Sequence, residues 1–145
     1  MSDVNKLYTS MELRMQVKAK EMADAGVKVT DDPIQVLNDI VTPLLAAARG
    51  GAEKEGWKAE VGATPVDPTV WLRVWQGEEG HPAGVMFYSQ DNNYVGSGLA
   101  MSYSETGSAN EVGFAPRDLS QYHPVGACAI VQIMLRKALG IYKPA

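Results

Sequence analysis

A cysteine and a histidine near the end of the chain are the first residues to consider for chemistry, because a thiol beside an imidazole base is the minimal pair for nucleophilic catalysis by cysteine. Cys128 and His123 lie five residues apart in a segment with helical spacing. Five residues correspond to about 500° of rotation on a helix, so the two side chains point well apart. Ala127 and Ala129 flank the thiol and favour a buried cysteine that packs as a small apolar residue. A cysteine-dependent enzyme is therefore our third hypothesis.

The sequence contains no recognisable metal-binding or phosphate-binding motif. The soft metal ligands are His81, His123 and Cys128, and no Cys-x-x-Cys or His-x-x-x-His spacing connects them. The segment Gly96-Ser97-Gly98 lacks the following Lys and Ser/Thr of a phosphate-binding loop and does not open a helix. Asp91, Glu105 and Glu111 are carboxylates that could act in acid and base catalysis, but no spacing selects a pair of them. We therefore expect no metal site and no cofactor.

Aromatic residues in the middle of the chain are the strongest indication of a binding surface. Residues 69–76 alternate with the period of two that is typical of a strand, which places successive side chains on opposite faces. One face receives the aliphatic residues Val70, Leu72 and Val74. The other face receives Trp71, Arg73 and Trp75. Both faces of the predicted sheet therefore need explanation.

The next two strands are expected to extend this aromatic face. We take Asp91-Asn92-Asn93 as a three-residue hairpin loop, which places Tyr88 opposite Gly96 and Met86 opposite Gly98. The predicted binding residues are then Trp71, Arg73, Trp75, Met86, Tyr88, Gly96 and Gly98. Aromatic walls beside a glycine floor suit a planar ligand, a peptide or another subunit. The alternative is that a helix covers this face and that Tyr88 packs over Gly96.

Two helices are expected before these strands. Thr9 and Glu12 have the spacing of a capping box, so the first helix begins near Thr9 and stops at Gly26. The second opens at Asp31-Asp32-Pro33, is kinked or broken at Pro43, and ends at Gly50-Gly51. A third, largely buried helix runs from His123-Pro124 to Leu139 at the other end of the chain.

The period of two and the turn-rich punctuation predict a β-meander between these helices. The expected strands cover residues 57–61, 69–76, 83–90, 94–104 and 110–115. We therefore predict one α+β domain spanning residues 1–145, with two N-terminal helices, a central antiparallel meander of three to five strands and a buried C-terminal helix.

Composition and charge limit the classes of partner. The formal net charge of −4 argues against a nucleic-acid partner, because attraction to a phosphate backbone needs a dense basic surface. One cysteine permits no intrachain disulfide and indicates a reducing compartment. The N-terminus does not resemble a secretory signal, and the longest apolar stretch, residues 125–135, is shorter than the roughly 20 residues of a membrane span. We expect a cytoplasmic protein with no membrane partner.

These observations lead to a functional hypothesis without a recognised family. The leading hypothesis is a noncatalytic interaction protein, such as an adaptor, inhibitor or assembly subunit, whose aromatic sheet face binds a protein partner or a second copy of the chain. Small proteins of phages and mobile elements often fit this description. The second hypothesis is a small-ligand-binding domain that uses the same face.

Overall fold

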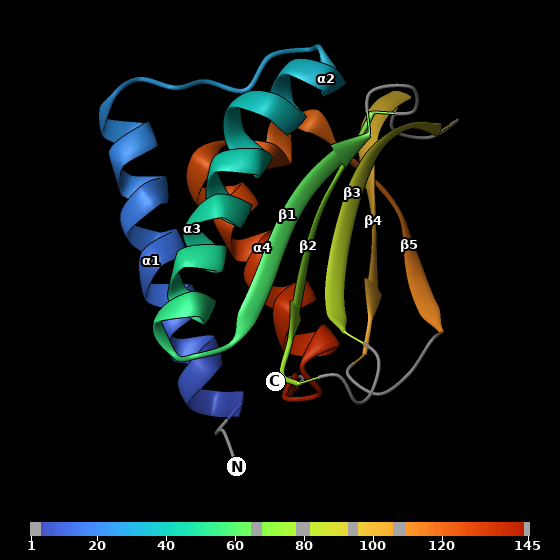
Figure 1. Ribbon diagram of the computed structural model, residues 1–145. Helices are drawn as coiled ribbons and strands as arrows, with labels where there is room; N and C mark the ends of the chain where they lie inside the picture. Colours follow the sequence, from blue (N-terminus) through green and yellow to red (C-terminus); the bar gives the residue numbers. More distant parts are fainter. Residues whose placement is uncertain (1–3, 65–67, 78–81, 93–95, 106–109, 144–145) are drawn as a thin grey trace.

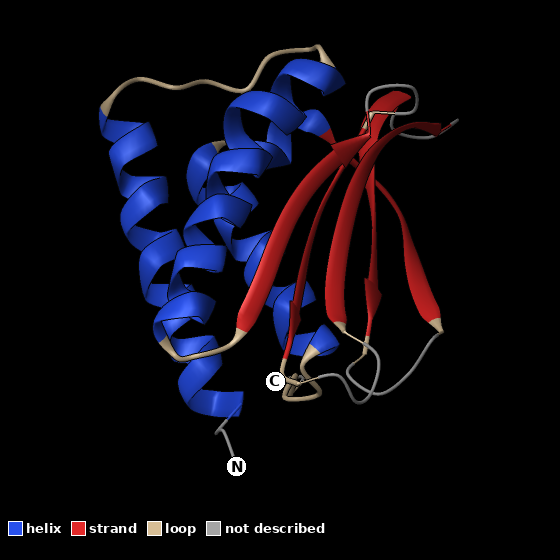
Figure 2. Cartoon of the chain, viewed as in Figure 1, coloured by secondary structure: helices blue, strands red, loops and turns tan. Residues whose placement is uncertain are grey.

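Five antiparallel strands form one sheet, and all the helices of the described residues lie against one of its faces (Figure 1; Figure 2). The computed structural model describes residues 4–64, 68–77, 82–92, 96–105 and 110–143, without the side chains of residues 91–97. The strands are β1 (Lys58–Thr64), β2 (Thr69–Trp75), β3 (Ala83–Asn92), β4 (Gly96–Ser104) and β5 (Glu111–Asp118). They neighbour one another in chain order, as expected of a meander, and the predicted α+β class is confirmed.

The helical layer contains segments from both ends of the chain. Its elements are α1 (Val4–Asp24), α2 (Pro33–Val36), a π-helical turn (Leu37–Val41), α3 (Thr42–Lys54), a 3-10 turn (Leu119–Tyr122) and α4 (Pro124–Ala138). A single cluster of buried side chains joins this layer to the inner face of the sheet. Within the described residues, no helix is long and apolar enough to cross a membrane.

The first helix begins earlier than its capping-box pattern predicts. Thr9 lies inside α1, which starts at Val4, and the Thr9 hydroxyl donates a hydrogen bond to the Asn5 carbonyl at 2.8 Å. A threonine inside a helix commonly satisfies its hydroxyl in this way, by bonding back to the preceding turn. The prediction of a helix start at Thr9 was therefore wrong.

The second helical segment passes Pro43 without a break. The Pro43 ring cannot donate to the preceding turn, and the chain widens into the π-helical turn just before it. The Leu37 carbonyl in this widened turn accepts hydrogen bonds from both the Thr42 backbone N–H and the Thr42 hydroxyl, the latter at 2.8 Å. At the start of this segment Asp32 accepts from the Ile34 N–H, which confirms the predicted cap.

The predicted end of this helix at Gly50-Gly51 was wrong, because Gly51 serves a different purpose. A Cβ at Gly51 would lie 2.6 Å from the Ser10 carbonyl oxygen and 2.7 Å from the Met11 Cα. Its missing side chain lets α3 approach the backbone of α1. The helix ends instead at Lys54, and Gly56 follows with a φ of +83°.

The register between β3 and β4 differs from the predicted one by four residues. Tyr88 pairs with Ala100 and Met86 with Ser102, instead of with Gly96 and Gly98. The strands are longer than expected, because residues 91 and 92 continue β3 where the sequence predicted a loop. The shift is even, so each side chain still lies on the predicted face of the sheet.

Candidate functional site

The outer sheet face, defined here as the face turned away from the helices, is organised in rows that cross the strands. One row runs Gly62, Trp71, Met86, Ser102 and Gly113 from β1 to β5. The next row runs Glu60, Arg73, Gly84, Ser104 and Glu111. These pairings bring the aromatic residues of β2 beside small and polar residues of the later strands.

Trp71 contacts one neighbour on the adjacent strand and one on its own strand. A Cβ on Gly62 would fall inside the Trp71 indole, so the ring covers that glycine. The Arg73 guanidinium carbon lies 4.6 Å from the indole centroid, within the range of a cation–π contact. The stack of Gly62, Trp71 and Arg73 therefore orients both an aromatic ring and a positive charge on the outer sheet face.

Strand β4 presents small residues to the outer sheet face. Ala100 is 0% exposed, Ser102 6% and Ser104 8%, although the helices of the described residues lie on the opposite side. The side chains of the flanking strands therefore rise around β4 and shield it. The face is hollowed along β4 instead of flat.

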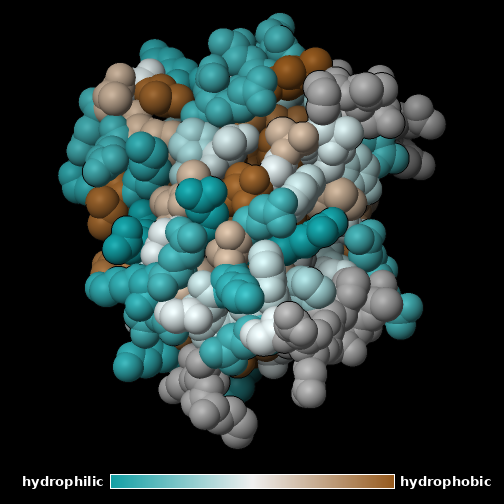
Figure 3. All heavy atoms as spheres, viewed as in Figure 1, coloured by the Kyte–Doolittle hydropathy of each residue, from teal (hydrophilic) through white to brown (hydrophobic). Residues whose placement is uncertain are grey.

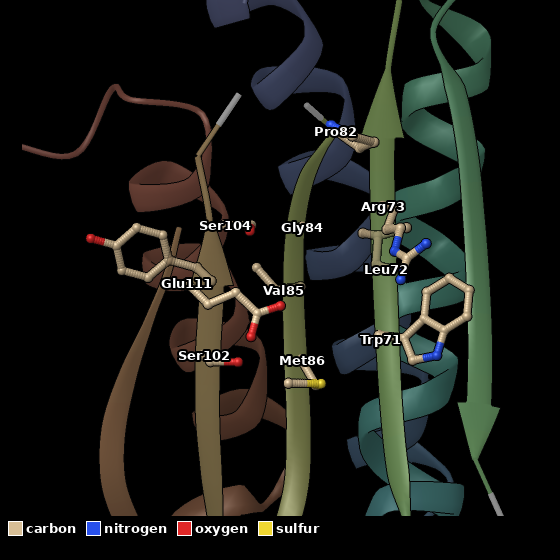
Figure 4. Close-up of a pocket in the computed structure, with 11 residues that line it drawn as sticks. Trp71, Leu72, Arg73, Pro82, Gly84, Val85, Met86, Ser102, Ser104 and Glu111 are labelled. Atoms are coloured by element: carbon tan, nitrogen blue, oxygen red, sulfur yellow. The ribbon is translucent and has the colours of Figure 1, made fainter. Parts of the chain in front are cut away.

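This hollow contains a pocket of about 210 Å³. Trp71, Arg73 and Met86 form one side of its lining, and Figure 4 shows Glu111 reaching from the other side toward β3. Gly84, Ser102 and Ser104 lie between these walls. The pocket therefore combines an aromatic wall, one cation, one anion and small polar residues.

The structure brings together only part of the predicted binding set. Trp71, Arg73 and Met86 line the pocket, whereas Trp75 lies beside Lys58 and Tyr88 lies between Thr69 and Ala100 on the same face. Of these, Trp75 and Tyr88 are partly exposed neighbours of the pocket, not part of its lining.

The two predicted glycines lie elsewhere on β4. Gly98 pairs with Gln90, and a Cβ there would collide with the Arg117 carbonyl, so this glycine permits close approach of β5. Gly96 pairs with Asn92 in the backbone register, one step further from the pocket. Their placement opposite Tyr88 and Met86 was wrong because the hairpin loop lies later in the chain than predicted.

The predicted binding set did not include Gly84, Ser102, Ser104 or Glu111, which line the pocket. Each follows from the cross-strand partners of Trp71 and Arg73 once the register is known. The available signal was the alternation of small residues in 98–104, which marks one face of β4. The alternation does not say which of those residues lies opposite Met86.

The cysteine near the C-terminus is buried in the interface between α1 and α4. Cys128 is 4% exposed, and its sulfur accepts a hydrogen bond from Gln132 at 3.4 Å. Burial raises the pKa of the thiol, and the nearby Glu12 carboxylate raises it further. The His123 side chain instead accepts from the Gly126 N–H at 3.2 Å and caps α4. Cys128 and His123 are therefore held in separate structural roles.

A second hollow lies on the helical side of the sheet, between β5 and α4. It has a volume of about 340 Å³ and an apolar lining that includes Met101, Phe114 and Ile133. Phe114 is 37% exposed and stacks with Tyr103 at 5.8 Å between ring centroids. The Lys137 ammonium lies 5.4 Å from the Phe114 ring centroid and covers part of this groove.

Elsewhere exposed apolar side chains lie on the helical layer, where Leu13 and Val17 are neighbours one helical turn apart and line the same shallow hollow. Leu13 and Val17 are 60% and 51% exposed on α1, and Ile34 is 48% exposed at the start of α2. Figure 3 shows hydrophobic residues as separate spots among hydrophilic ones on the side it presents. Small groups of exposed apolar residues such as this pair are ordinary on a protein surface.

The described residues contain no cluster of His, Cys, Asp and Glu that would hold a metal ion. His81, one of the metal ligands considered from the sequence, lies outside the described residues. No protein-family model, curated protein or solved structure matches this chain.

Proposed function

We propose that this chain is a noncatalytic interaction protein, an adaptor, inhibitor or assembly subunit, whose outer sheet face docks a protein partner. The observation that carries the proposal is the one-sided helical layer. It leaves Trp71, Trp75, Met86 and Tyr88 partly exposed on the opposite side of the sheet. Tryptophan, tyrosine, methionine and arginine are the residue types that protein interfaces favour.

The charges on this face support a separate protein partner over a second copy of the chain. Lys58 and Arg73 alternate across β1 and β2 with Glu60, and Glu111 lies at the far end of the Arg73 row. All four are exposed. Obligate dimer interfaces are more apolar and depleted of charge at their centre, whereas non-obligate interfaces combine aromatic anchors with a polar rim.

A double substitution, Trp71→Ala with Trp75→Ala, tests the proposal. The matched control is Leu13→Ser with Val17→Ser, which removes two exposed apolar side chains from α1 in the helical layer. Wild type and both variants serve as bait in lysate from the native host, and each captured protein is then purified and titrated against all three by calorimetry. We expect binding to be lost in the tryptophan variant and retained in the control.

The same variants separate the competing occupants. Sedimentation of the purified chain across a concentration series measures self-association directly. Dimerisation that the tryptophan substitutions abolish would assign the face to a second copy and overturn the proposal of a separate partner. If the tryptophan variant and wild type bind a purified partner with equal affinity, the outer sheet face is not the binding surface. Circular dichroism verifies that each variant is folded.

A further inference from the structure

Two opposite charges lie on opposite walls of the outer-face pocket. Arg73 on β2 and Glu111 on β5 belong to the same cross-strand row, with Gly84 and Ser104 between them. Both side chains are exposed, and the ion pairs of the described residues are formed by other side chains, on α1 and α3. Each charge is therefore available to a ligand in the pocket.

Only small residues lie between the two charged side chains. Gly84 has no side chain, and Ser102 and Ser104 contribute short hydroxymethyl groups that are 6% and 8% exposed. Figure 4 shows the Glu111 carboxylate extending over β4 toward β3, while the Arg73 guanidinium bends toward Trp71. The hollow thus has an end suited to an anion and an end suited to a cation.

The separation of the two ends indicates the length of the ligand. The Cα atoms of Arg73 and Glu111 are three strand spacings apart, which is about 14 Å at ~4.8 Å per spacing. The extended Glu111 side chain shortens the distance between the two charged groups. An α-amino acid carries its ammonium and carboxylate groups on the same carbon atom and is still too short to span that distance. An alkyl chain between the charges would pass over Gly84 and Ser104 and beside Met86, which line the same pocket.

We propose that this pocket binds a zwitterion in which an alkyl chain separates a carboxylate from an ammonium group, as in an ω-amino acid or a lysine at a free chain end. The carboxylate pairs with the Arg73 guanidinium, whose planar fork matches a carboxylate and whose orientation is set by stacking on Trp71. The ammonium group pairs with Glu111. The volume of about 210 Å³ suits such a molecule, since pockets for drug-sized ligands start at roughly 300 Å³.

This site goes beyond the proposed docking of a protein, and it does not require that partner. A pocket that binds a free zwitterion would do so even if the outer sheet face bound no protein. The experiment therefore uses the purified full chain alone, so its failure leaves the docking proposal untouched.

Titration with 6-aminohexanoate tests the proposal, with hexanoate and hexylamine as ligands of the same length that keep one charge each. Calorimetry measures affinity, and the part of the tryptophan fluorescence change that is lost in Trp71→Phe reports on the pocket wall. We expect 6-aminohexanoate to bind at least about 10-fold more tightly than either single-charge ligand, because each charged hydrogen bond contributes. L-alanine, with its charges close together, should bind no better than those two. Equal affinities, or no binding of 6-aminohexanoate at millimolar concentration, would overturn the proposal.

Three neutralising variants locate the site. Arg73→Gln and Glu111→Gln should each weaken 6-aminohexanoate binding about 10-fold. Glu60→Gln is the matched control, because Glu60 neighbours Arg73 in the same row but does not line the pocket. An equal effect of Glu60→Gln and Glu111→Gln would show that general surface charge, not this pocket, attracts the ligand. All three residues are exposed, so the fold should tolerate each change.

A peptide pair identifies the source of the zwitterion. A short peptide ending in lysine with a free carboxylate is compared with the same peptide as its C-terminal amide. Tighter binding of the free acid than of the amide assigns the site to a chain end. Binding of free 6-aminohexanoate without binding of either peptide assigns it to a small molecule. Equal binding of acid and amide contradicts the proposed role of Arg73.

Discussion

The indole of Trp71 covers Gly62, its partner on the neighbouring strand β1. The space that a Cβ would need at Gly62 is already filled by the ring, so this glycine is required by its cross-strand neighbour. Arg73 stacks on the same ring, and the pocket on the outer sheet face depends on how that ring lies. Gly62 on the edge strand β1 therefore leaves room for the ring on which Arg73 stacks, three strand spacings from Glu111 on the far wall of the pocket.

Substitution of Gly62 should displace Trp71. We expect Gly62→Ala to destabilise the fold by at most about 1 kcal/mol, because the added methyl group displaces an indole that is partly exposed and can move. The control is Gly113→Ala in the same cross-strand row, where a Cβ would meet no atom within 4 Å. Urea unfolding measures stability, and the tryptophan emission spectrum reports the ring's environment. Equal stability and equal emission of Gly62→Ala and wild type would contradict the observed stacking.

Alanine substitutions at two adjacent glycines in α3 should have different effects on the stability of the fold. A Cβ at Gly51 would press on the backbone of α1, so we expect Gly51→Ala to cost at least about 2 kcal/mol. At Gly50 the nearest atom is the end of the flexible Arg14 side chain, at 3.3 Å. Gly50→Ala should therefore be neutral or stabilise the helix by up to about 1 kcal/mol. Thermal unfolding of both variants provides the comparison, and similar destabilisation of the two would argue against close helix packing at Gly51.

Removal of two buried tyrosine hydroxyls should also have different effects on stability. The Tyr122 hydroxyl donates to the Leu99 carbonyl at 3.3 Å and links the 3-10 turn to β4, so Tyr122→Phe should destabilise by about 1 kcal/mol. The Tyr8 hydroxyl is buried without a hydrogen-bond partner in the described structure. Tyr8→Phe should therefore be neutral or stabilising, because it removes an unsatisfied polar group. A loss of stability in Tyr8→Phe as large as that in Tyr122→Phe would reveal a partner for Tyr8.

Stability should fall at alkaline pH. Burial raises the pKa of Tyr8 to about 12 and also raises the pKa values of Tyr122 and Cys128. The unfolded chain releases these protons at lower pH than the folded chain, so the free energy of unfolding decreases once pH exceeds the ordinary cysteine pKa of about 8.5. The Tyr8 contribution is lost as pH rises from about 10 to about 12. Urea unfolding from pH 7 to 11 should show this decline, with a shallower slope above pH 10 in Tyr8→Phe.

The Cys128 thiol should be unreactive in the folded protein. Its burial and raised pKa leave little accessible thiolate at neutral pH. We expect slow labelling by a thiol-specific reagent in buffer and rapid labelling in denaturant. Rapid labelling of the native chain at neutral pH would restore the hypothesis of a cysteine-dependent enzyme.

The alternation of side chains determined which face each strand residue occupies. Trp71 and Arg73 share one face of the sheet as predicted, and Asp32 and His123 begin their helices, because strand period and helix caps act over a few neighbouring residues. The α+β class follows from the same local patterns.

Only the tertiary structure decided which residues meet across the sheet. A shift of four residues between β3 and β4 preserves every face, so alternation alone does not distinguish Gly98 from Ser102 as the neighbour of Met86. That register brings Ser104 and Glu111 into the row of Arg73 and so creates the pocket. The same reason explains Gly51, which read as a helix stop in the sequence and became a contact point only when α1 packed against it.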